Sequence, residues 1–293
     1  MTEYFPGVNY PKSFPTQKQD RQPGIEKNMN PRPIFEDPDY GIAPGRLKDK
    51  IAVITGGDSG IGRAVALAFA KEGADIAIIY LNENEDAEQT KTHIDKTGRK
   101  CMLIAGDVGD ENFCIEAVNR VIGEFGKIDI LVNNAAEQHV QTKLEDITKE
   151  QLERTFKTNV FSAFYLTKAV LPYLKAGSSI INTTSITAYK GSQDLIDYSA
   201  TKGALTTFTR SLSTNLASKN IRVNAVAPGP IWTPLIPASF NEQDVAKFGS
   251  DTPMARAGQP VELAAAYVFL ASNDASYITG QTIHVNGGVI VNS

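Results

Sequence analysis

The sequence predicts an α/β fold, in which one doubly wound parallel sheet of about seven strands carries helices on both faces and is preceded by an extended N-terminal arm. Three observations predict it. Short, almost continuously apolar runs alternate with longer helical patterns, and a glycine-rich turn directly follows the first apolar run. In addition, eight of the 15 prolines fall within the first fifty residues.

The apolar runs have the composition of strands covered on both faces, because nearly every position in them is hydrophobic. They lie at residues 51–55, 75–80, 100–105, 128–132, 179–183, 222–227 and 282–285. Helical patterns lie between them, at residues 61–71, 85–96, 111–124, 149–174, 198–216 and 261–271. This alternation implies right-handed crossovers between parallel strands. We find no internal repeat and no second strand-helix series, so residues 50–293 are expected to form one domain.

Residues 1–49 differ from the rest, because their prolines exclude long helices. Two interpretations remain open: a mobile tail, or an extended arm anchored to the folded domain by its apolar side chains. The candidate anchors are Tyr4, Phe5, Tyr10, Phe14, Ile34, Phe35 and Tyr40. We favour the anchored arm.

The overall composition is that of a water-soluble globular protein, with 42% hydrophobic and 21% charged residues. A net charge of -4 gives no general attraction to nucleic acid or to acidic membranes. No basic leader and no apolar stretch of about 18 residues is evident, so a cytoplasmic location is expected. Cys101 and Cys114 lack metal-ligand spacing and are expected to be buried free thiols. The three histidines are scattered, so no metal site is expected.

The glycine-rich turn spans residues 56–62, between the first strand and the first helix. Glycines there permit backbone conformations closed to other residues, and they let amides approach a pyrophosphate at the positive end of the helix. Strand, turn, apolar helix and second strand follow in the order that a dinucleotide-binding unit requires. A bound dinucleotide is therefore predicted.

Cofactor choice depends on the end of the second strand, where an acidic side chain would bind a free ribose 2′-hydroxyl and a basic one a 2′-phosphate. Tyr80 and Leu81 occupy these positions and do neither. Asp58 in the glycine-rich turn would repel a nearby phosphate. NAD is therefore expected in preference to NADP, with either cofactor compatible with the turn.

Tyr198 and Lys202 are four residues apart, so on a helix both side chains project from one face. A nearby positive charge favours a phenolate and lowers the pKa of a tyrosine. Such a pair also arises by chance on exposed helices, but here it follows the dinucleotide turn and Ser185, which stands at the end of the fifth strand. The combination predicts proton-transfer chemistry.

These motifs resemble those of the short-chain dehydrogenase/reductase family, whose fold is Rossmann-like, over roughly residues 50–293. The match includes Thr-Gly-x-x-x-Gly-x-Gly at residues 55–62, Asp107-Val108 after the third strand, and Asn-Asn-Ala-Ala at residues 133–136, where the family usually ends in glycine. The Asn pair is as compatible with a strand-stabilising role as with ligand contact. The arm further suggests a subgroup of bacterial reductases with a long Pro-rich N-terminal extension.

The resemblance and the turn together predict a set of cofactor contacts. The set comprises Gly56, Asp58, Ser59, Gly60, Ile61, Gly62, Tyr80, Leu81, Asp107, Val108, Asn134, Ala135, Tyr198, Lys202, Pro228, Gly229, Ile231 and Thr233. By the same resemblance, Ile231 and Thr233 would meet the nicotinamide amide.

Asn159, Ser185, Tyr198 and Lys202 match the catalytic tetrad of the family in order and spacing. Reduction of a carbonyl by hydride builds negative charge on oxygen, which must receive a proton, and Tyr198 would supply it. Ser185 would polarise the carbonyl, and Lys202 would lower the pKa of the tyrosine and hold the nicotinamide ribose. Asn159 would retain a water, or would serve only as a structural, helix-breaking residue.

Residues 234–258 are too long for a tight connection and are expected to form a lid over the reacting groups. Its apolar residues, Leu235, Ile236, Phe240, Phe248 and Met254, favour a small aldehyde, ketone or secondary alcohol without a large anionic group. Other candidates for substrate contact, equally well explained as polar loop residues, are Ser192, Asp194, Asp197, Gln138 and His139.

Two functions follow from the sequence. The first is an NAD(P)-dependent oxidoreductase that interconverts a small carbonyl and an alcohol, expected from the resemblance to be a homotetramer. The second is a non-enzymatic dinucleotide sensor or scaffold that recruits a partner through its arm. The complete tetrad favours the enzyme, because binding alone requires neither the tyrosine nor the serine. Candidates for burial at a subunit contact, or in the core, are Phe161, Phe164, Tyr165 and Leu166.

Overall fold

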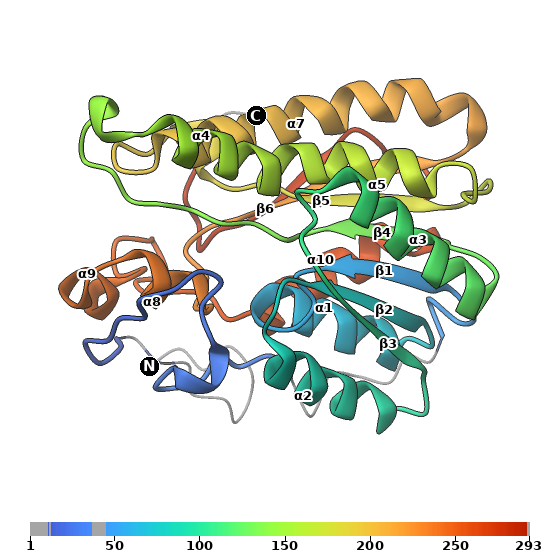
Figure 1. The fold of residues 1–293 in the computed structure, drawn as a ribbon, viewed down its shortest axis with the longest axis horizontal. Coiled ribbons are helices and arrows are strands. Elements are labelled where there is room, and N and C mark those ends of the chain that lie inside the picture. Colours follow the sequence, from blue (N-terminus) through green and yellow to red (C-terminus); the bar gives the residue numbers. More distant parts are fainter. Residues whose placement is uncertain (1–10, 12, 37–44, 292–293) are drawn as a thin grey trace.

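A computed structural model describes residues 11, 13–36 and 45–291 of the chain (Figure 1). Its centre is a seven-stranded sheet in which all adjacent strands pair in parallel, in the order β3-β2-β1-β4-β5-β6-β7. The strands are β1 Ile51–Thr55, β2 Asp75–Tyr80, β3 Cys101–Ala105, β4 Ile130–Asn133, β5 Ser179–Thr183, β6 Arg222–Pro228 and β7 Thr282–Val285. The predicted doubly wound sheet is confirmed. Because the strand order reverses between β1 and β4, a crevice opens at the carboxyl ends of these strands.

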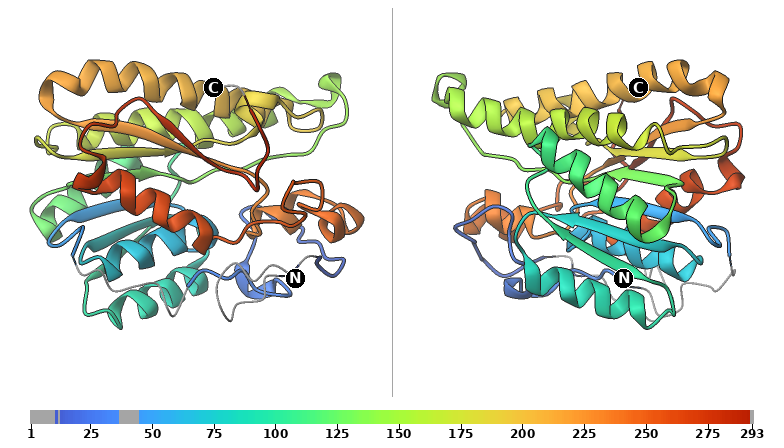
Figure 2. Two further views of the ribbon diagram at one scale, coloured as in Figure 1. Left: turned by 180° about the vertical axis from the view of Figure 1, so that it is seen from behind. Right: turned by 45° about the vertical axis from the view of Figure 1, so that its right-hand side comes forward.

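Helices cover both faces of the sheet (Figure 2). The α-helices of the described residues are α1 Gly60–Lys71, α2 Asn84–Asp95, α3 Glu111–Phe125, α4 Lys149–Phe156, α5 Ser162–Val170, α6 Thr187–Lys190, α7 Ile196–Leu216, α8 Leu235–Ser239, α9 Glu242–Lys247 and α10 Val261–Ala271. One apolar cluster joins α1, α2 and α10 to the sheet, and a second joins α3, α5 and α7 to its other face. The glycine-rich turn and the tetrad thus belong to a sandwich with two well-packed cores.

One predicted helix, 149–174, is wrong as a continuous element. It divides into α4, a π-helical turn at Lys157–Phe161 and α5, which ends at Val170. The side chain of Asn159 in the π-turn pairs with the backbone of Glu137, in the loop after β4. A π-helical turn contains one residue more than an α-helical turn, and Asn159 lies within it. Such turns are frequent at functional sites.

The arm lies against the domain beside α8 and α9 in all three views (Figures 1 and 2). Phe14 stacks on Trp232 with ring centroids 3.8 Å apart, and the Trp232 indole donates to the carbonyl of Pro31 at 2.9 Å. The amide of Gln19 donates to the carbonyl of Pro237 at 2.6 Å. Of the predicted anchors, Phe14 is buried and Ile34 and Phe35 are half-buried. The others, Tyr4, Phe5, Tyr10 and Tyr40, lie outside the described residues.

Both cysteines are buried and free, as predicted. Burial raises the pKa of each thiol to about 12, which leaves both unreactive at neutral pH. Over residues 11, 13–36 and 45–291, none of the helices has the length and apolar character to cross a bilayer. The same residues contain no group of three or more His, Cys, Asp or Glu side chains placed to hold a metal ion.

Candidate active site

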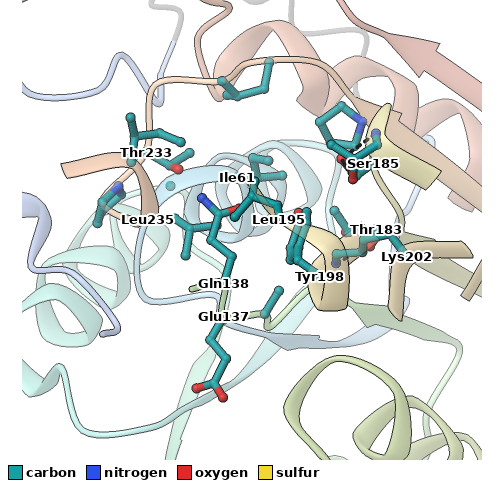
Figure 3. A pocket seen from close by; sticks show the side chains of 18 of the residues that line it. Ile61, Glu137, Gln138, Thr183, Ser185, Leu195, Tyr198, Lys202, Thr233 and Leu235 are labelled. Carbon is teal, nitrogen blue, oxygen red and sulfur yellow. Dashed lines mark hydrogen bonds between the residues drawn. The ribbon is translucent and has the colours of Figure 1, made fainter. Parts of the chain in front are cut away.

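A cavity of about 780 Å³ opens at the carboxyl edge of the sheet (Figure 3). Its walls come from the glycine-rich turn, the ends of β2, β4, β5 and β6, the start of α7 and the segment that contains α8 and α9. In Figure 3, Ser185, Tyr198 and Lys202 gather on one side of it, and Thr233 and Leu235 lie on the other. Its size is typical of a pocket for a small molecule or a cofactor.

The glycine-rich turn forms the floor of this pocket at the start of α1. Gly56 and Gly60 have φ values of 61° and 51°, in the left-handed region that favours glycine. An added Cβ at Gly60 would stand 3.1 Å from Thr233 across the turn. The first amides of α1 have no partner within the helix, and Ile61 in that first turn lines the pocket. The turn therefore suits the pyrophosphate of a dinucleotide.

Gly62 was predicted to contact the cofactor, but it does not line the pocket. A Cβ there would lie 1.9 Å from the carbonyl oxygen of Gly56. Gly62 therefore lets α1 pack against the turn. The spacing that suggested ligand contact reflects helix-strand packing at this position.

The remaining predicted cofactor residues all line the pocket. They are Gly56, Asp58, Ser59, Gly60, Ile61, Tyr80, Leu81, Asp107, Val108, Asn134, Ala135, Tyr198, Lys202, Pro228, Gly229, Ile231 and Thr233.

The Asn pair after β4 holds strands together. Asn133 donates to Asn182 of β5 at 2.9 Å, and the Asn134 amide donates to the carbonyls of Thr55 and Gly56 at 3.0 and 3.2 Å. The Thr55 hydroxyl accepts from the backbone amide of Asn134 at 2.9 Å. The strand-stabilising interpretation therefore accounts for both side chains, although Asn134 also reaches the pocket wall.

Acidic side chains of the glycine-rich turn and of the segments after β2 and β3 line one part of the pocket. Burial raises the pKa of Asp58 to about 6, although a hydrogen bond from Ser59 opposes the shift. Glu83, three residues beyond β2, also lines the pocket, and burial raises its pKa as well. Next to Val108, Asp107 pairs with Arg154 of α4. Arg154 was not singled out from the sequence, although it lies only five residues before Asn159.

Ser185, Tyr198 and Lys202 meet because β5 ends beside the first turns of α7. The Ser185 hydroxyl lies close enough to the Tyr198 phenol to lower its pKa. The Lys202 ammonium donates to the carbonyl of Thr183 at 2.8 Å and lies 5.4 Å from the centre of the Tyr198 ring. All three are buried. The carbonyl of Thr183 was not predicted, since a backbone acceptor leaves no signal in sequence.

In this structure the pKa of Tyr198 follows its burial and not the charge of Lys202. Burial raises the pKa of Tyr198 to about 12, and the nearby Ser185 hydroxyl opposes the rise. Burial also lowers the pKa of Lys202 to about 7, because a dry site disfavours an ammonium. Tyr198 therefore holds its proton at neutral pH, as a proton donor must.

Asn159 is buried behind the pocket and does not line it. Its amide donates to the carbonyl of Glu137 at 2.9 Å and to the Thr201 hydroxyl at 3.1 Å, and its oxygen accepts from the amide of Glu137 at 2.9 Å. These bonds join the loop after β4 to α7 between Tyr198 and Lys202. Asn159 therefore connects two segments that flank the pocket.

The predicted lid holds two short helices, α8 and α9, and places Leu235, Ile236, Phe240 and Phe248 on the pocket wall. Met254 is 43% exposed and lies away from it. Of the polar residues named from the sequence as candidates for substrate contact, Gln138, Ser192 and Asp194 line the pocket. His139 and Asp197 do not. Asp197 instead accepts hydrogen bonds from Gln151 and Thr155 of α4.

We expect Lys202→Met to stabilise the fold by roughly 1 to 3 kcal/mol at pH 6, where the buried ammonium is most costly. The unfolded chain binds this proton up to about pH 10.5 and the folded chain only up to about 7. The cost is therefore fully present below pH 7 and disappears as the pH rises toward 10.5. Thermal melts at pH 6, 8 and 10 should show a gain that shrinks with pH, and Lys219→Met, at an exposed position, should show none. A pH-independent difference would contradict the assignment.

Comparison with known proteins places this pocket in context. Residues 56–290 match a family model described as Enoyl-(Acyl carrier protein) reductase. The chain is 66% identical to "Uncharacterized oxidoreductase YhxC" of Bacillus subtilis, over 96% of this chain and 98% of that protein. It is 53% identical to "Glucose and ribitol dehydrogenase" of Daucus carota, over 95% and 98% of the two chains.

Solved structures of other proteins have a similar fold. A short chain dehydrogenase from Burkholderia cenocepacia in complex with NADP is 32% identical, with a TM-score of 0.78 over 83% of this chain and 99% of that one. A 3-ketoacyl-(acyl-carrier-protein) reductase from Brucella melitensis complexed with NADH is 35% identical, with a TM-score of 0.76 over 83% and 98%. Sheet, pocket and relatives together show that the chain belongs to the short-chain dehydrogenase/reductase family of NAD(P)-dependent oxidoreductases.

Proposed function

We propose that this oxidoreductase interconverts a small aldehyde or ketone and the corresponding alcohol, with Tyr198 as the general acid and base. The observation that carries the proposal is the buried group of Ser185, Tyr198 and Lys202 on one wall of a pocket whose floor is the glycine-rich turn. When bound, a nicotinamide supplies or accepts the hydride. The chain must then place the carbonyl oxygen and move one proton.

The residues divide this work. Tyr198, protonated at neutral pH, donates its proton to the carbonyl oxygen, and the Ser185 hydroxyl polarises that oxygen. Once Tyr198 has given up its proton, a negatively charged phenolate remains. The Lys202 ammonium beside it stabilises this charge, and its lowered pKa lets it exchange a proton near neutral pH. Asn159 fixes the loop after β4 to α7 and so maintains the spacing of the group. Retention of a water by Asn159, as the family resemblance implies, remains part of this proposal.

The substrate wall combines apolar lid residues with polar groups. Leu235, Ile236 and Phe248 face Gln138 and Asp194 around the pocket. The amide and the carboxylate suit hydroxyl groups, and Lys190 and Lys247 line the same pocket. The Daucus carota relative is named for glucose and ribitol. We therefore propose small uncharged aldehydes, ketones and polyols as the substrate class, to be tested by an absorbance screen of such compounds with both cofactors.

We further propose that NAD is preferred over NADP. Asp58 and Glu83 both line the pocket near the end of β2, where a 2′-phosphate would add negative charge, and Arg21 compensates only the charge of Glu83. The Burkholderia cenocepacia structure holds NADP and the Brucella melitensis structure holds NADH, so the fold itself accommodates either. Fluorescence titration should give a lower dissociation constant for NADH than for NADPH. Tenfold tighter binding of NADPH would overturn this preference.

A homotetramer and a cytoplasmic location complete the proposal. Phe161 and Phe164 are 40% and 50% exposed on α5 and the preceding turn, as residues of a subunit contact would be. Leu166 is buried in the core of the chain, so it is not part of such a surface. Sedimentation velocity tests the assembly. Relatives that match nearly the whole chain support membership of a subgroup with an N-terminal extension. The oxidoreductase relatives support the enzyme over the sensor or scaffold alternative.

A further inference from the structure

Residues 21–26 of the arm run around the mouth of the pocket and touch its wall at four places. The places are the end of β2, the loop after β4, the lid at α8 and the start of α1. Each belongs to a different part of the domain. The arm is therefore the element that connects the lid to the nucleotide end of the sheet.

The first two contacts are made by polar side chains. Arg21 pairs with Glu83 and donates to Asn82 at 2.6 Å, just beyond the end of β2. Gln22 makes two bonds to the backbone of Gln138: its amide donates to the carbonyl, and its oxygen accepts from the amide at 3.1 Å. Because a backbone segment is bound through both its donor and its acceptor, the position of Gln138 in the pocket wall depends on Gln22.

The third contact is a close approach of backbones. Pro23 and Gly24 themselves line the pocket, and Gly24 is buried against the lid. A Cβ added at Gly24 would lie 2.2 Å from the carbonyl oxygen of Pro234 and 3.1 Å from Ala238. Only glycine lets the arm lie this close to α8.

The fourth contact reaches the helix that would face the pyrophosphate. Glu26 accepts a hydrogen bond from the amide of Gly60 at 2.7 Å and pairs with Arg63 inside the domain. Glu26 and Arg63 are each 1% exposed. This end of the arm is therefore fixed to α1 by a buried ion pair.

We propose that residues 21–26 are part of the dinucleotide-binding site, with Gln22 as the positioning residue that holds the arm across the mouth. The inference rests on the proposed function only in that it requires a bound nicotinamide dinucleotide. Pro23 and Gly24 line the same pocket as the glycine-rich turn, so a dinucleotide held there would be enclosed in part by the arm. Its release would then require the contacts of the arm to break, so the arm would slow release.

The test is stopped-flow measurement of NADH and NADPH release, followed by cofactor fluorescence, in the full-length protein. We expect Gln22→Ala and Gly24→Ala each to accelerate release at least fivefold. Gln22→Glu keeps the acceptor for the amide of Gln138 and should restore part of the slow release. Limited proteolysis should cut the arm faster in the Ala variants.

Two matched controls should leave release unchanged. Asp20→Ala alters an arm side chain that is 91% exposed, and Gly123→Ala adds a methyl group that meets no atom within 4 Å. Far-ultraviolet circular dichroism checks that each variant is folded. Release rates within twofold of the wild type in both Ala variants would overturn the inference.

Failure of the proposed function looks different in these experiments. The release measurement needs no substrate, so a wild type that binds cofactor but reduces no carbonyl would disprove the proposed reaction and leave the arm testable. A wild type that binds neither cofactor would overturn both.

Discussion

Replacing Tyr198 with Phe is expected to lower kcat by about 10² to 10⁴-fold, the range that general acid-base catalysis contributes. The variant loses only the phenolic hydroxyl, which lies beside Ser185 and holds the proton that the carbonyl oxygen must receive. Because the ring remains, the packing of α7 and the contact with Lys202 persist. Steady-state kinetics in the reducing direction, with cofactor binding measured separately, would show a loss of turnover with an unchanged cofactor dissociation constant.

Tyr189→Phe is the matched control for this experiment. Tyr189 stands four residues beyond Ser185, and within the described part of the chain its buried hydroxyl has no hydrogen-bond partner. Loss of that hydroxyl should leave kcat unchanged. Near-normal turnover of Tyr198→Phe would show that another group delivers the proton, and weakened cofactor binding in it would point to a structural defect.

Arg63→Met should lower the free energy of unfolding by about 3 to 5 kcal/mol, as removal of one partner from a buried charge network does. The Arg63 guanidinium pairs with Glu26 and Asp86 and donates to the carbonyl of Asp58 at 2.8 Å. Without it, buried carboxylates face one another with no cation between them. Urea unfolding at pH 8 measures the loss.

The pH dependence and a second substitution separate this cause from lost packing. Burial already raises the pKa of Glu26 to about 7, so at pH 5 this group is neutral in the folded protein and the loss should be smaller than at pH 8. The double variant Arg63→Met, Glu26→Gln should recover part of the stability at pH 8. Arg120→Met on the exposed face of α3 should cost little. Equal losses at both pH values would indicate packing alone.

Much of the fold was predictable because strands covered on both faces must be apolar throughout. Val53 and Ile54 of β1, Ile78 of β2 and Leu131 of β4 are all fully buried. The reactive group was predictable for a related reason: its chemistry requires particular side chains, and a helix puts Tyr198 and Lys202 on one face.

The rest depends on geometry that leaves little trace in sequence. The π-turn around Asn159 replaces a helix that the apolar pattern made continuous, because the pattern does not register one extra residue in a turn. The pKa of Tyr198 depends on how completely neighbouring segments exclude water. The role of Gln22 rests on a single side chain reaching Gln138, 116 residues away, and no local pattern reveals such a contact.

The stacking of Phe14 on Trp232 sets the order in which the molecule can be completed. During synthesis the N-terminal segment leaves the ribosome first, but the ring on which it rests comes more than two hundred residues later. Contacts so distant along the chain form late, because a long loop must close before they are gained. The arm can thus be completed only in two stages. The contacts of Glu26 with α1 involve residues 26–63 and can form early, whereas the contact of Phe14 must wait until β6 and the residues after it have been synthesised.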